Sequence, residues 1–228
     1  MNLDARELPD FVRVNRGKRV TLVHPDFADA VSNALLDGKG TEPAGVVGRG
    51  RLSQVTTERG TVLIRRYIRG GMIGRVMKEV YTLDVRPLRE LGAHMQAWRK
   101  GVPTVLPIGA TWEGSGPYHS IAFATLRANA VDLMEYLQTH PDFDPAVLAD
   151  CGRAIRAMHL ADIYHRDLQV KNLIVATGAA FIIDFDGAKV KQVTPAMANR
   201  NLARLKRSFV KQGLPLTAFD AIATACFK

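Results

Sequence analysis

The chain has 228 residues, of which 47% are hydrophobic and 23% charged, enough for one large domain or two small lobes and unlike a disordered composition. Lys and Arg outnumber Asp and Glu by 31 to 22, and the net charge of +9 favours an anionic partner such as a nucleotide, a phosphorylated sugar, a phospholipid head group or a nucleic acid. No apolar stretch reaches 18 residues, which argues against a membrane span. The sequence has no helix-turn-helix or zinc-finger motif and no interleaving of basic and aromatic residues, which argues against nucleic-acid binding as the primary function.

The N-terminus and the cysteines indicate a cytoplasmic protein. The opening MNLDARELPDF lacks the basic start and apolar run of a secretory signal. Cys151 and Cys226 are the only cysteines, and without a C-x-x-C pair they have no metal-site spacing. A reducing compartment with two inert thiols is therefore expected.

Residues 1–44 form an N-terminal extension to which no role can be given. They are polar and contain three prolines as breakers. One short helix is predicted at Ala28–Leu36, ended by Gly38.

Residues 45–127 predict a small, mostly antiparallel sheet with one helix. A hairpin with a Gly-rich first bend leads into a strand over 61–68, and two more strands are expected at 105–111 and 118–126. The helix over 86–100 carries apolar residues at helical spacing and is stopped by Gly101. Its predicted buried face is Leu88, Leu91, Met95 and Trp98.

Residues 128–228 are predicted to be mostly helical. A short helix over 131–138 precedes a longer one that Asp144-Pro145 caps. Two apolar strands around Thr177-Gly178 form a hairpin, and Thr194-Pro195 caps a last main helix that ends near Gly213. The predicted fold class is therefore α+β, with a sheet lobe, a short helical lobe and a cleft between them.

The segment His165-Arg166-Asp167-Leu168, with Asn172 five residues after the Asp, fits H-R-D-L-x-x-x-N. The predicted hairpin then leads to Asp184-Phe185-Asp186. Phosphoryl transfer needs one carboxylate that accepts the hydrogen bond of the attacking hydroxyl, together with an amide and a carboxylate that hold Mg²⁺ against the phosphates. Asp167 suits the first role, and Asn172 and Asp184 suit the second, because Mg²⁺ prefers hard oxygen ligands.

These motifs, with four further segments, resemble the bacterial lipopolysaccharide kinase family, which has a protein-kinase-like fold. The resemblance covers about residues 45–212, and its most specific pieces are the Arg-Gly-Gly of 69–71 and the Ile-Asp-Phe-Asp of 183–186. The further segments are the Gly-Arg-Gly of 48–50, the segment of 64–71 that ends in this Arg-Gly-Gly, the Arg-Pro-Leu-Arg-Glu of 86–90 and the tail of 201–209.

The resemblance implies an ATP- and Mg²⁺-dependent phosphotransferase acting on a hydroxyl of 3-deoxy-D-manno-octulosonic acid (Kdo) in the lipid A precursor, at the cytoplasmic face of the inner membrane. It implies that Asp167 is the base, and that Asn172 and Asp184 are the metal ligands. It also implies that residues 48–55, including Gly48, Arg49, Gly50 and Ser53, cover the phosphates with their backbone N–H groups.

A kinase site also needs a cation on the α- and β-phosphates, held by a helix Glu. Arg65 stands where protein kinases have Lys, and Glu90, the only acidic residue of the 86–100 helix, is its natural partner. Strand alternation leaves open that Arg66 faces the cleft instead, and Glu90 could pair with Arg86 or Arg89 on the surface.

The remaining motif residues have plainer roles. His165 is expected to support the backbone of the catalytic loop, since Asp167 already supplies the base. Asp186 stands where protein kinases have Gly and could contact a second metal or cap a helix. His159 and Met158 are expected to pack within their helix.

Two basic clusters remain. Arg200, Arg204, Arg207 and Lys211 recur at helical spacing, and no acidic residue occurs between Gly187 and Phe219. This row is either a solvated face or a platform for an anionic glycolipid or an anionic membrane surface. The second cluster comprises Arg66, Arg69, Arg75 and Lys78, and it could face the acceptor.

Other functions remain open at this point. A heptose or other small-molecule kinase, a compact atypical protein kinase and a pseudokinase that binds nucleotide or lipid all fit part of the pattern. Only 44 residues follow Asp184 and no Ala-Pro-Glu motif occurs, which argues against protein substrates. A basic nucleic-acid-binding domain would show steep salt dependence and no kinase activity.

Overall fold

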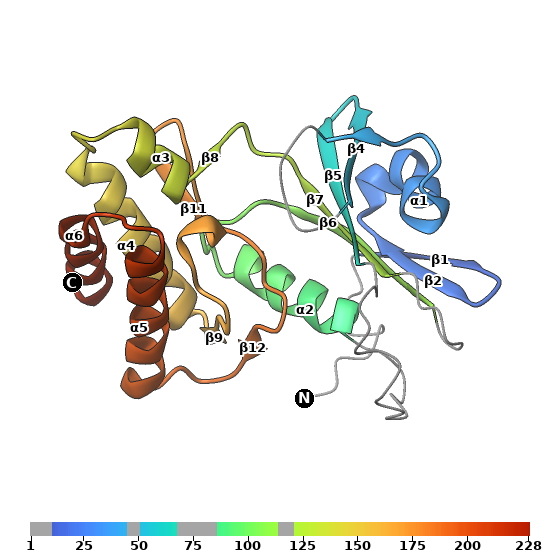
Figure 1. Ribbon diagram of the computed structural model, residues 1–228. Helices are drawn as coiled ribbons and strands as arrows, with labels where there is room; N and C mark the ends of the chain where they lie inside the picture. Colours follow the sequence, from blue (N-terminus) through green and yellow to red (C-terminus); the bar gives the residue numbers. More distant parts are fainter. Residues whose placement is uncertain (1–10, 45–50, 68–85, 114–120) are drawn as a thin grey trace, which may run out of the picture. The chain divides into compact units, whose positions relative to one another are not determined.

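The computed structural model describes residues 11–44, 51–67, 86–113 and 121–228 (Figure 1). The chain divides into two compact units. Unit 1 comprises Met1–Gly92 and Leu106–Arg127, and unit 2 comprises Ala93–Val105 and Ala128–Lys228. In the described residues, no helix is long and apolar enough to cross a membrane.

Unit 1 is built on one seven-stranded antiparallel sheet. Its strand order is β1-β2-β6-β7-β5-β4-β3. The strands are β1 Val12–Arg16, β2 Arg19–Val23, β3 Glu42–Pro43, β4 Arg51–Thr57, β5 Gly60–Tyr67, β6 Pro107–Glu113 and β7 Ile121–Leu126. The expected hairpin is β4-β5, whose register pairs Val55 with Val62.

The described part of the predicted N-terminal extension, residues 11–44, contributes strands to this sheet. The β1-β2 hairpin joins it through β2, which pairs with β6 from Arg19↔Glu113 to Val23↔Gly109. A short 3-10 turn, η2 Pro25–Phe27, leads into helix α1 Ala28–Asp37, which ends at Gly38 as the sequence predicted. Buried side chains of α1 pack with strand residues in the core of unit 1. The helix contributes Val31, Ala34 and Leu35, and the strands contribute Val23, Val55, Val62, Ile64 and Ile108.

Gly109 shows how closely these elements approach. A Cβ atom at this position would lie 2.5 Å from the backbone oxygen of Leu22 on the neighbouring strand and 3.1 Å from Leu35 of α1. Any larger residue would push β2 and α1 away from β6.

Helix α2 Arg86–Arg99 begins in unit 1 and ends in unit 2. Leu88, Leu91 and Met95 are buried as predicted, but Trp98 is 44% exposed, so its place in the predicted buried face was wrong. The preceding residue, Ala97, is buried instead and belongs to the core of unit 2. Helical spacing puts Trp98 near the edge of the apolar stripe, where a one-residue rotation decides burial.

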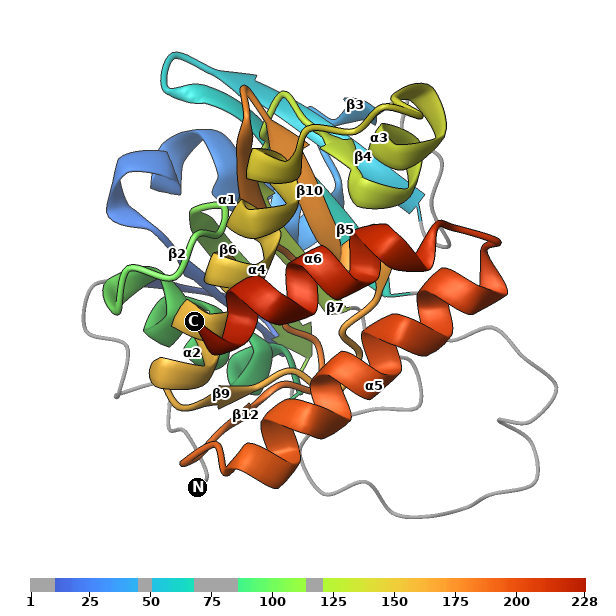
Figure 2. The same ribbon diagram turned by 90° about the vertical axis from the view of Figure 1, so that its left-hand side faces the viewer.

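Unit 2 is mostly helical (Figure 2). Its further helices are α3 Leu133–Thr139, α4 Pro145–Leu160, α5 Pro195–Lys211 and α6 Leu216–Phe227. A three-stranded sheet of order β11-β10-β8 contains β8 Val131–Asp132, β10 Leu173–Ala176 and β11 Ala179–Ile182. A second, two-stranded sheet pairs β9 Ile163–Tyr164 with β12 Lys189–Val190.

Local signals in the sequence account for most elements of unit 2. The side chain of Asp144 accepts a hydrogen bond from the Ala146 N–H at the start of α4, and Thr194 caps α5 in the same way. Thr177 and Gly178 both have positive φ in the turn between β10 and β11. The sequence did not predict α6, which packs so closely on α4 that a Cβ at Gly152 would lie 2.4 Å from the oxygen of Ile222.

Candidate active site

The predicted catalytic loop, residues 165–172, follows β9, and the His165 side chain contacts its backbone from inside. The His165 side chain is fully buried. Its Nδ1 accepts from the Asp167 N–H at 3.2 Å, and its Nε2 lies 3.2 Å from the oxygen of Ile183. This arrangement fits the neutral tautomer with hydrogen on Nε2. Burial also lowers the pKa of His165, which favours the same neutral form.

Phe185 fixes the segment after β11 by packing between two histidine rings. Its ring centroid lies 4.7 Å from that of His94 and 5.6 Å from that of His165. His94 Nε2 is 2.9 Å from Thr104 Oγ1 and 2.8 Å from the oxygen of Val105. The sequence argument missed His94. Its signal was a polar ring on the same face of α2 as the buried Leu91 and Met95.

The three acidic and amide candidates of unit 2 are connected through their backbone. Asn172 is the last residue of a 3-10 turn, η4 Val170–Asn172, and its Nδ2 donates to the oxygen of Asp167 at 2.8 Å. The Ile183 N–H donates to the Asn172 oxygen at 2.9 Å, which places Asp184 directly beyond the base of the β10-β11 hairpin. Asp184 has φ 64°, a conformation that costs free energy for a residue with a Cβ and that often occurs at functional sites.

The side chain of Asp167 reaches solvent. It is 51% exposed, and its Oδ1 lies 3.3 Å from Nη1 of Arg204 on α5. A carboxylate that reaches solvent from a rigid loop is suited to meet an incoming hydroxyl.

Asn201 connects the loop to two helices. This side chain is 1% exposed, and its Nδ2 donates to the oxygen of His165 while its Oδ1 lies 3.1 Å from Nε2 of His159 on α4. Burial lowers the pKa of His159, so it too is held neutral. The sequence argument used Asn201 only as part of the family-like tail, although an Asn on the buried face of α5 was a usable signal.

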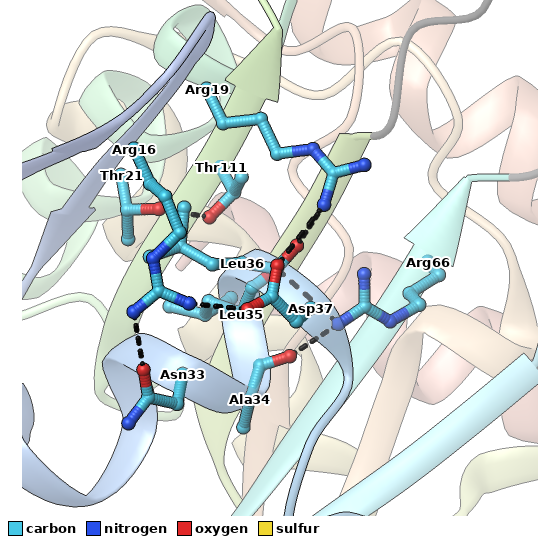
Figure 3. Close-up of polar contacts among 10 residues, drawn as sticks. All are labelled: Arg16, Arg19, Thr21, Asn33, Ala34, Leu35, Leu36, Asp37, Arg66 and Thr111. Atoms are coloured by element: carbon cyan, nitrogen blue, oxygen red, sulfur yellow. Dashed lines mark hydrogen bonds and ion pairs between the residues drawn. The ribbon is translucent and has the colours of Figure 1, made fainter.

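In unit 1, β5 presents two adjacent arginines to different partners. Nη2 of Arg65 lies 2.6 Å from Oε1 of Glu90, a carboxylate that is only 2% exposed. Arg66 instead donates to the carbonyls of Ala34 and Leu35 at the C-terminal end of α1 (Figure 3). Of the two arrangements that alternation left open, the structure therefore brings Arg65 and Glu90 together.

The end of α1 gathers three arginines. Besides Arg66, Arg19 donates to the Leu36 oxygen at 2.7 Å and pairs with Asp37, while Arg16 pairs with Asp37 and reaches Asn33 (Figure 3). Terminal helix carbonyls lack intrahelical partners, and these cations satisfy several of them. The three guanidinium groups thus have a structural explanation.

The predicted phosphate loop is described only in part. Gly48, Arg49 and Gly50 lie outside the described residues, as does the Arg69, Arg75 and Lys78 part of the second basic cluster. Ser53 is on β4, and its buried hydroxyl has no hydrogen-bond partner among the residues that the structure describes. Buried polar atoms rarely lack a hydrogen-bond partner, so Ser53 Oγ is a candidate contact for a ligand.

The site residues fall into two groups. Ser53, Arg65 and Glu90 belong to unit 1, and Asp167, Asn172 and Asp184 belong to unit 2. Their convergence on one nucleotide stays a prediction.

Comparison with known proteins identifies relatives along most of the chain. The model of the lipopolysaccharide kinase (Kdo/WaaP) family matches residues 42–224. A 3-deoxy-D-manno-octulosonic acid kinase of Vibrio cholerae is 29% identical over 197 residues, which are 84% of this chain and 83% of that protein. Kinases of the same name from Vibrio vulnificus and Xanthomonas campestris are 32% and 30% identical, covering 72% and 76% of this chain and 72% of each relative.

A solved structure supports the fold assignment. WaaP, determined in complex with acyl carrier protein, superimposes with a TM-score of 0.63 at 17% sequence identity. The match covers 91% of this chain and 88% of that chain. The predicted kinase-like α+β fold is therefore confirmed.

Proposed function

The chain belongs to the lipopolysaccharide kinase (Kdo/WaaP) family, and on this premise we propose that it transfers a phosphoryl group from ATP to a hydroxyl of Kdo on a lipid A precursor. Curated relatives bear the name of this sugar kinase. The structural observation that carries the proposal is the catalytic loop. In it, a buried neutral His165 and a buried Asn201 hold an accessible Asp167 beside Asn172 and the Asp184 turn.

Asp167 is proposed as the base. Its carboxylate reaches solvent, while its own N–H and carbonyl are both engaged, by His165 and Asn172 respectively. The backbone of Asp167 is therefore fixed, and the side chain can accept the proton of the attacking hydroxyl. A positioned base contributes about 10²- to 10⁴-fold to a rate.

Asn172 and Asp184 fit Mg²⁺. Since Asn172 uses its Nδ2 to hold Asp167, its carboxamide oxygen remains as the metal-binding atom, and Asp184 follows the residue that bonds to the Asn172 backbone. One amide and one carboxylate oxygen suit an ion that binds few protein ligands together with phosphates and waters. Bound Mg²⁺ would neutralise charge that develops on the phosphates during transfer.

Arg65 and Ser53 are proposed to contact the nucleotide. Glu90 orients the Arg65 guanidinium, which is 29% exposed and whose planar fork suits a phosphate. Ser53 contributes the buried hydroxyl on β4, ahead of the Arg65 strand. Gly48, Arg49 and Gly50 remain proposed backbone contacts by their place in the sequence.

We also propose that the protein works peripherally at the cytoplasmic face of the inner membrane. Its net charge of +9 favours approach to an anionic surface, and a lipid-linked acceptor would lie there.

The test is a transfer assay with labelled ATP, Mg²⁺ and a Kdo-bearing lipid A precursor, beside a heptose-bearing lipid and a generic basic protein. We expect label on the Kdo lipid and a loss of about 10²- to 10⁴-fold in Asp167→Asn. Asp220→Asn, which removes an exposed carboxylate from α6, is the matched control and should retain activity. Label on the heptose lipid or the protein alone would overturn the Kdo assignment.

A further inference from the structure

A basic pocket lies directly beside the catalytic loop, within unit 2. It has a volume of about 190 Å³, and its walls come from η4 and from α5. Four of its lining residues are cationic: Lys171, Arg204, Arg207 and Lys211. Arg204 is the residue whose guanidinium also reaches Asp167.

The positive charge of this pocket is poorly compensated. Among the described residues, no carboxylate lies within ion-pair distance of Lys171, Arg207 or Lys211, and the carboxylate that pairs with Arg204 is that of Asp167, at 3.3 Å. The sequence places no acidic residue between Gly187 and Phe219, so α5 offers no internal counter-charge. Several like charges around one hollow favour binding of an anion.

The pocket is also fixed to the catalytic loop. The Val170 N–H donates to Ser208 Oγ at 3.1 Å, and Ser208 Oγ donates to the oxygen of Leu205 at 2.8 Å. Leu205 and Phe209 are fully buried, so this face of α5 is anchored in the core. An anion held here would therefore lie at a defined position relative to Asp167.

We propose that this pocket binds an oxyanion of the acceptor, either a phosphate or a carboxylate, and so positions the acceptor hydroxyl at Asp167. The proposal rests on the proposed function and adds the residues that recognise the acceptor. Without acceptor, Arg204 pairs with Asp167. With acceptor bound, the same guanidinium contacts the oxyanion and leaves Asp167 open to the hydroxyl. Lys171, Arg207 and Lys211 are positioning residues.

A flat membrane contact explains the pocket less well. The cationic side chains surround a hollow and come from two separate elements, α5 and η4. The η4 turn begins three residues after the proposed base Asp167 and ends at the proposed metal ligand Asn172. A surface that only attracts lipid head groups needs no hydrogen bond between α5 and the catalytic loop.

The test uses two double variants with the same loss of charge. Arg207→Gln/Lys211→Gln removes two pocket cations, and Arg200→Gln/Lys206→Gln removes two exposed cations of the same helix that do not line the pocket. The KM for the Kdo-bearing acceptor is measured in neutral detergent micelles, so that surface charge of a membrane does not contribute. We expect an increase of about 10- to 100-fold in the pocket variant only, with the KM for ATP unchanged.

Two altered acceptors identify the source of the anion. One lacks the phosphates of the lipid, and the other carries an amidated Kdo carboxylate. With the acceptor that lacks the group bound in the pocket, the wild type and the pocket variant should have the same KM. Inorganic phosphate should compete with the acceptor in the wild type and less in the variant.

Three results would overturn the proposal. The first is an equal KM in the two double variants, and the second is a KM difference between wild type and pocket variant that persists with both altered acceptors. The third is an unchanged KM of the pocket variant in micelles, combined with weaker binding to anionic vesicles that lack Kdo. The last result would assign the pocket to the membrane surface. Failure of the proposed function looks different, because the wild type would then label no Kdo lipid at all. Lys171→Gln, on the other wall, gives an independent check of the same expectation.

Discussion

In unit 1 the side chains around the candidate nucleotide residues are held by charge, whereas in unit 2 the catalytic loop is held by neutral groups. Arg65 pairs with Glu90, and Arg66 binds the carbonyl end of α1. In contrast, His165 and Asn201 form buried hydrogen bonds without a formal charge. Contacts of the first kind should respond to salt, and those of the second kind to truncation and to acid.

The two tryptophans allow each unit to be followed separately. Trp112 is on β6 in unit 1, and Trp98 is in the part of α2 that belongs to unit 2. Trp112→Phe leaves a reporter in unit 2, and Trp98→Phe leaves one in unit 1.

The largest effect is expected from Asn201→Leu. The substitution keeps the side-chain size but leaves the buried oxygen of His165 and the half-buried ring of His159 without their shared partner. Each such group costs about 1 to 3 kcal/mol, so we expect a loss of about 2 to 6 kcal/mol in the free energy of unfolding. Urea unfolding followed by Trp98 measures it. Asn33→Ala removes an exposed contact with Arg16 in unit 1, is followed by Trp112, and should cost less than about 1 kcal/mol. Equal losses in the two variants would contradict the expected difference between buried and exposed contacts.

Arg65→Met should have the next largest effect. It withdraws a cation from a carboxylate that is 2% exposed, and breaking such a pair costs about 3 to 5 kcal/mol. Because Arg65 itself is partly exposed, we expect the lower end, about 3 kcal/mol. Arg59→Met breaks the exposed pair with Asp26 and serves as the matched control, with an expected cost below about 1 kcal/mol. Urea unfolding followed by Trp112 compares them, and similar costs would show that burial of Glu90 does not matter.

Acid should destabilise the neutral network of unit 2. Burial lowers the pKa of both His159 and His165, so below about pH 6.5 the unfolded chain binds protons that the folded chain does not. Stability is therefore fully present above about pH 6.5 and falls as the pH decreases, by about 1.4 kcal/mol per histidine and pH unit until the folded groups also titrate.

His159→Gln tests this sign. Gln cannot titrate but can still donate to Asn201. Between pH 6.5 and 5.5 the variant should lose less stability than the wild type, by at most about 1 kcal/mol, in urea unfolding followed by Trp98. Parallel curves would contradict the assignment of His159 as a buried neutral group.

These contrasts also show what a sequence can predict. Helix α4, the β10-β11 hairpin and the end of α1 follow from short-range signals: Asp144-Pro145, Thr177-Gly178 and Gly38. Helix α6 escaped prediction because its N-cap residue, Pro215, makes no side-chain hydrogen bond and its sequence is apolar on several faces.

Long-range pairing and polar partners were harder to predict. β2 pairs with β6 across about 90 residues, and nothing in the local pattern of residues 19–23 indicates that neighbour. Alternation on β5 places Arg65 and Arg66 on opposite faces without saying which face meets Glu90. Likewise, the spacing of α5 buries Asn201 but does not name His159 or His165 as its partners.

The smallest effect is expected from Asp37→Asn in the arginine cluster at the end of α1. The carboxylate gains from Arg16 and Arg19 but sits at the negative end of the helix dipole, so the two contributions oppose each other. We expect a change below about 1 kcal/mol at 0.15 M salt, and none at 1 M salt, where the Debye length is about 3 Å. Urea unfolding followed by Trp112 at both salt concentrations measures it. Since the cost of Asn201→Leu arises from buried neutral groups, it should persist at 1 M salt. A salt-independent loss of several kcal/mol in Asp37→Asn would show that charge is not what distinguishes unit 1 from unit 2.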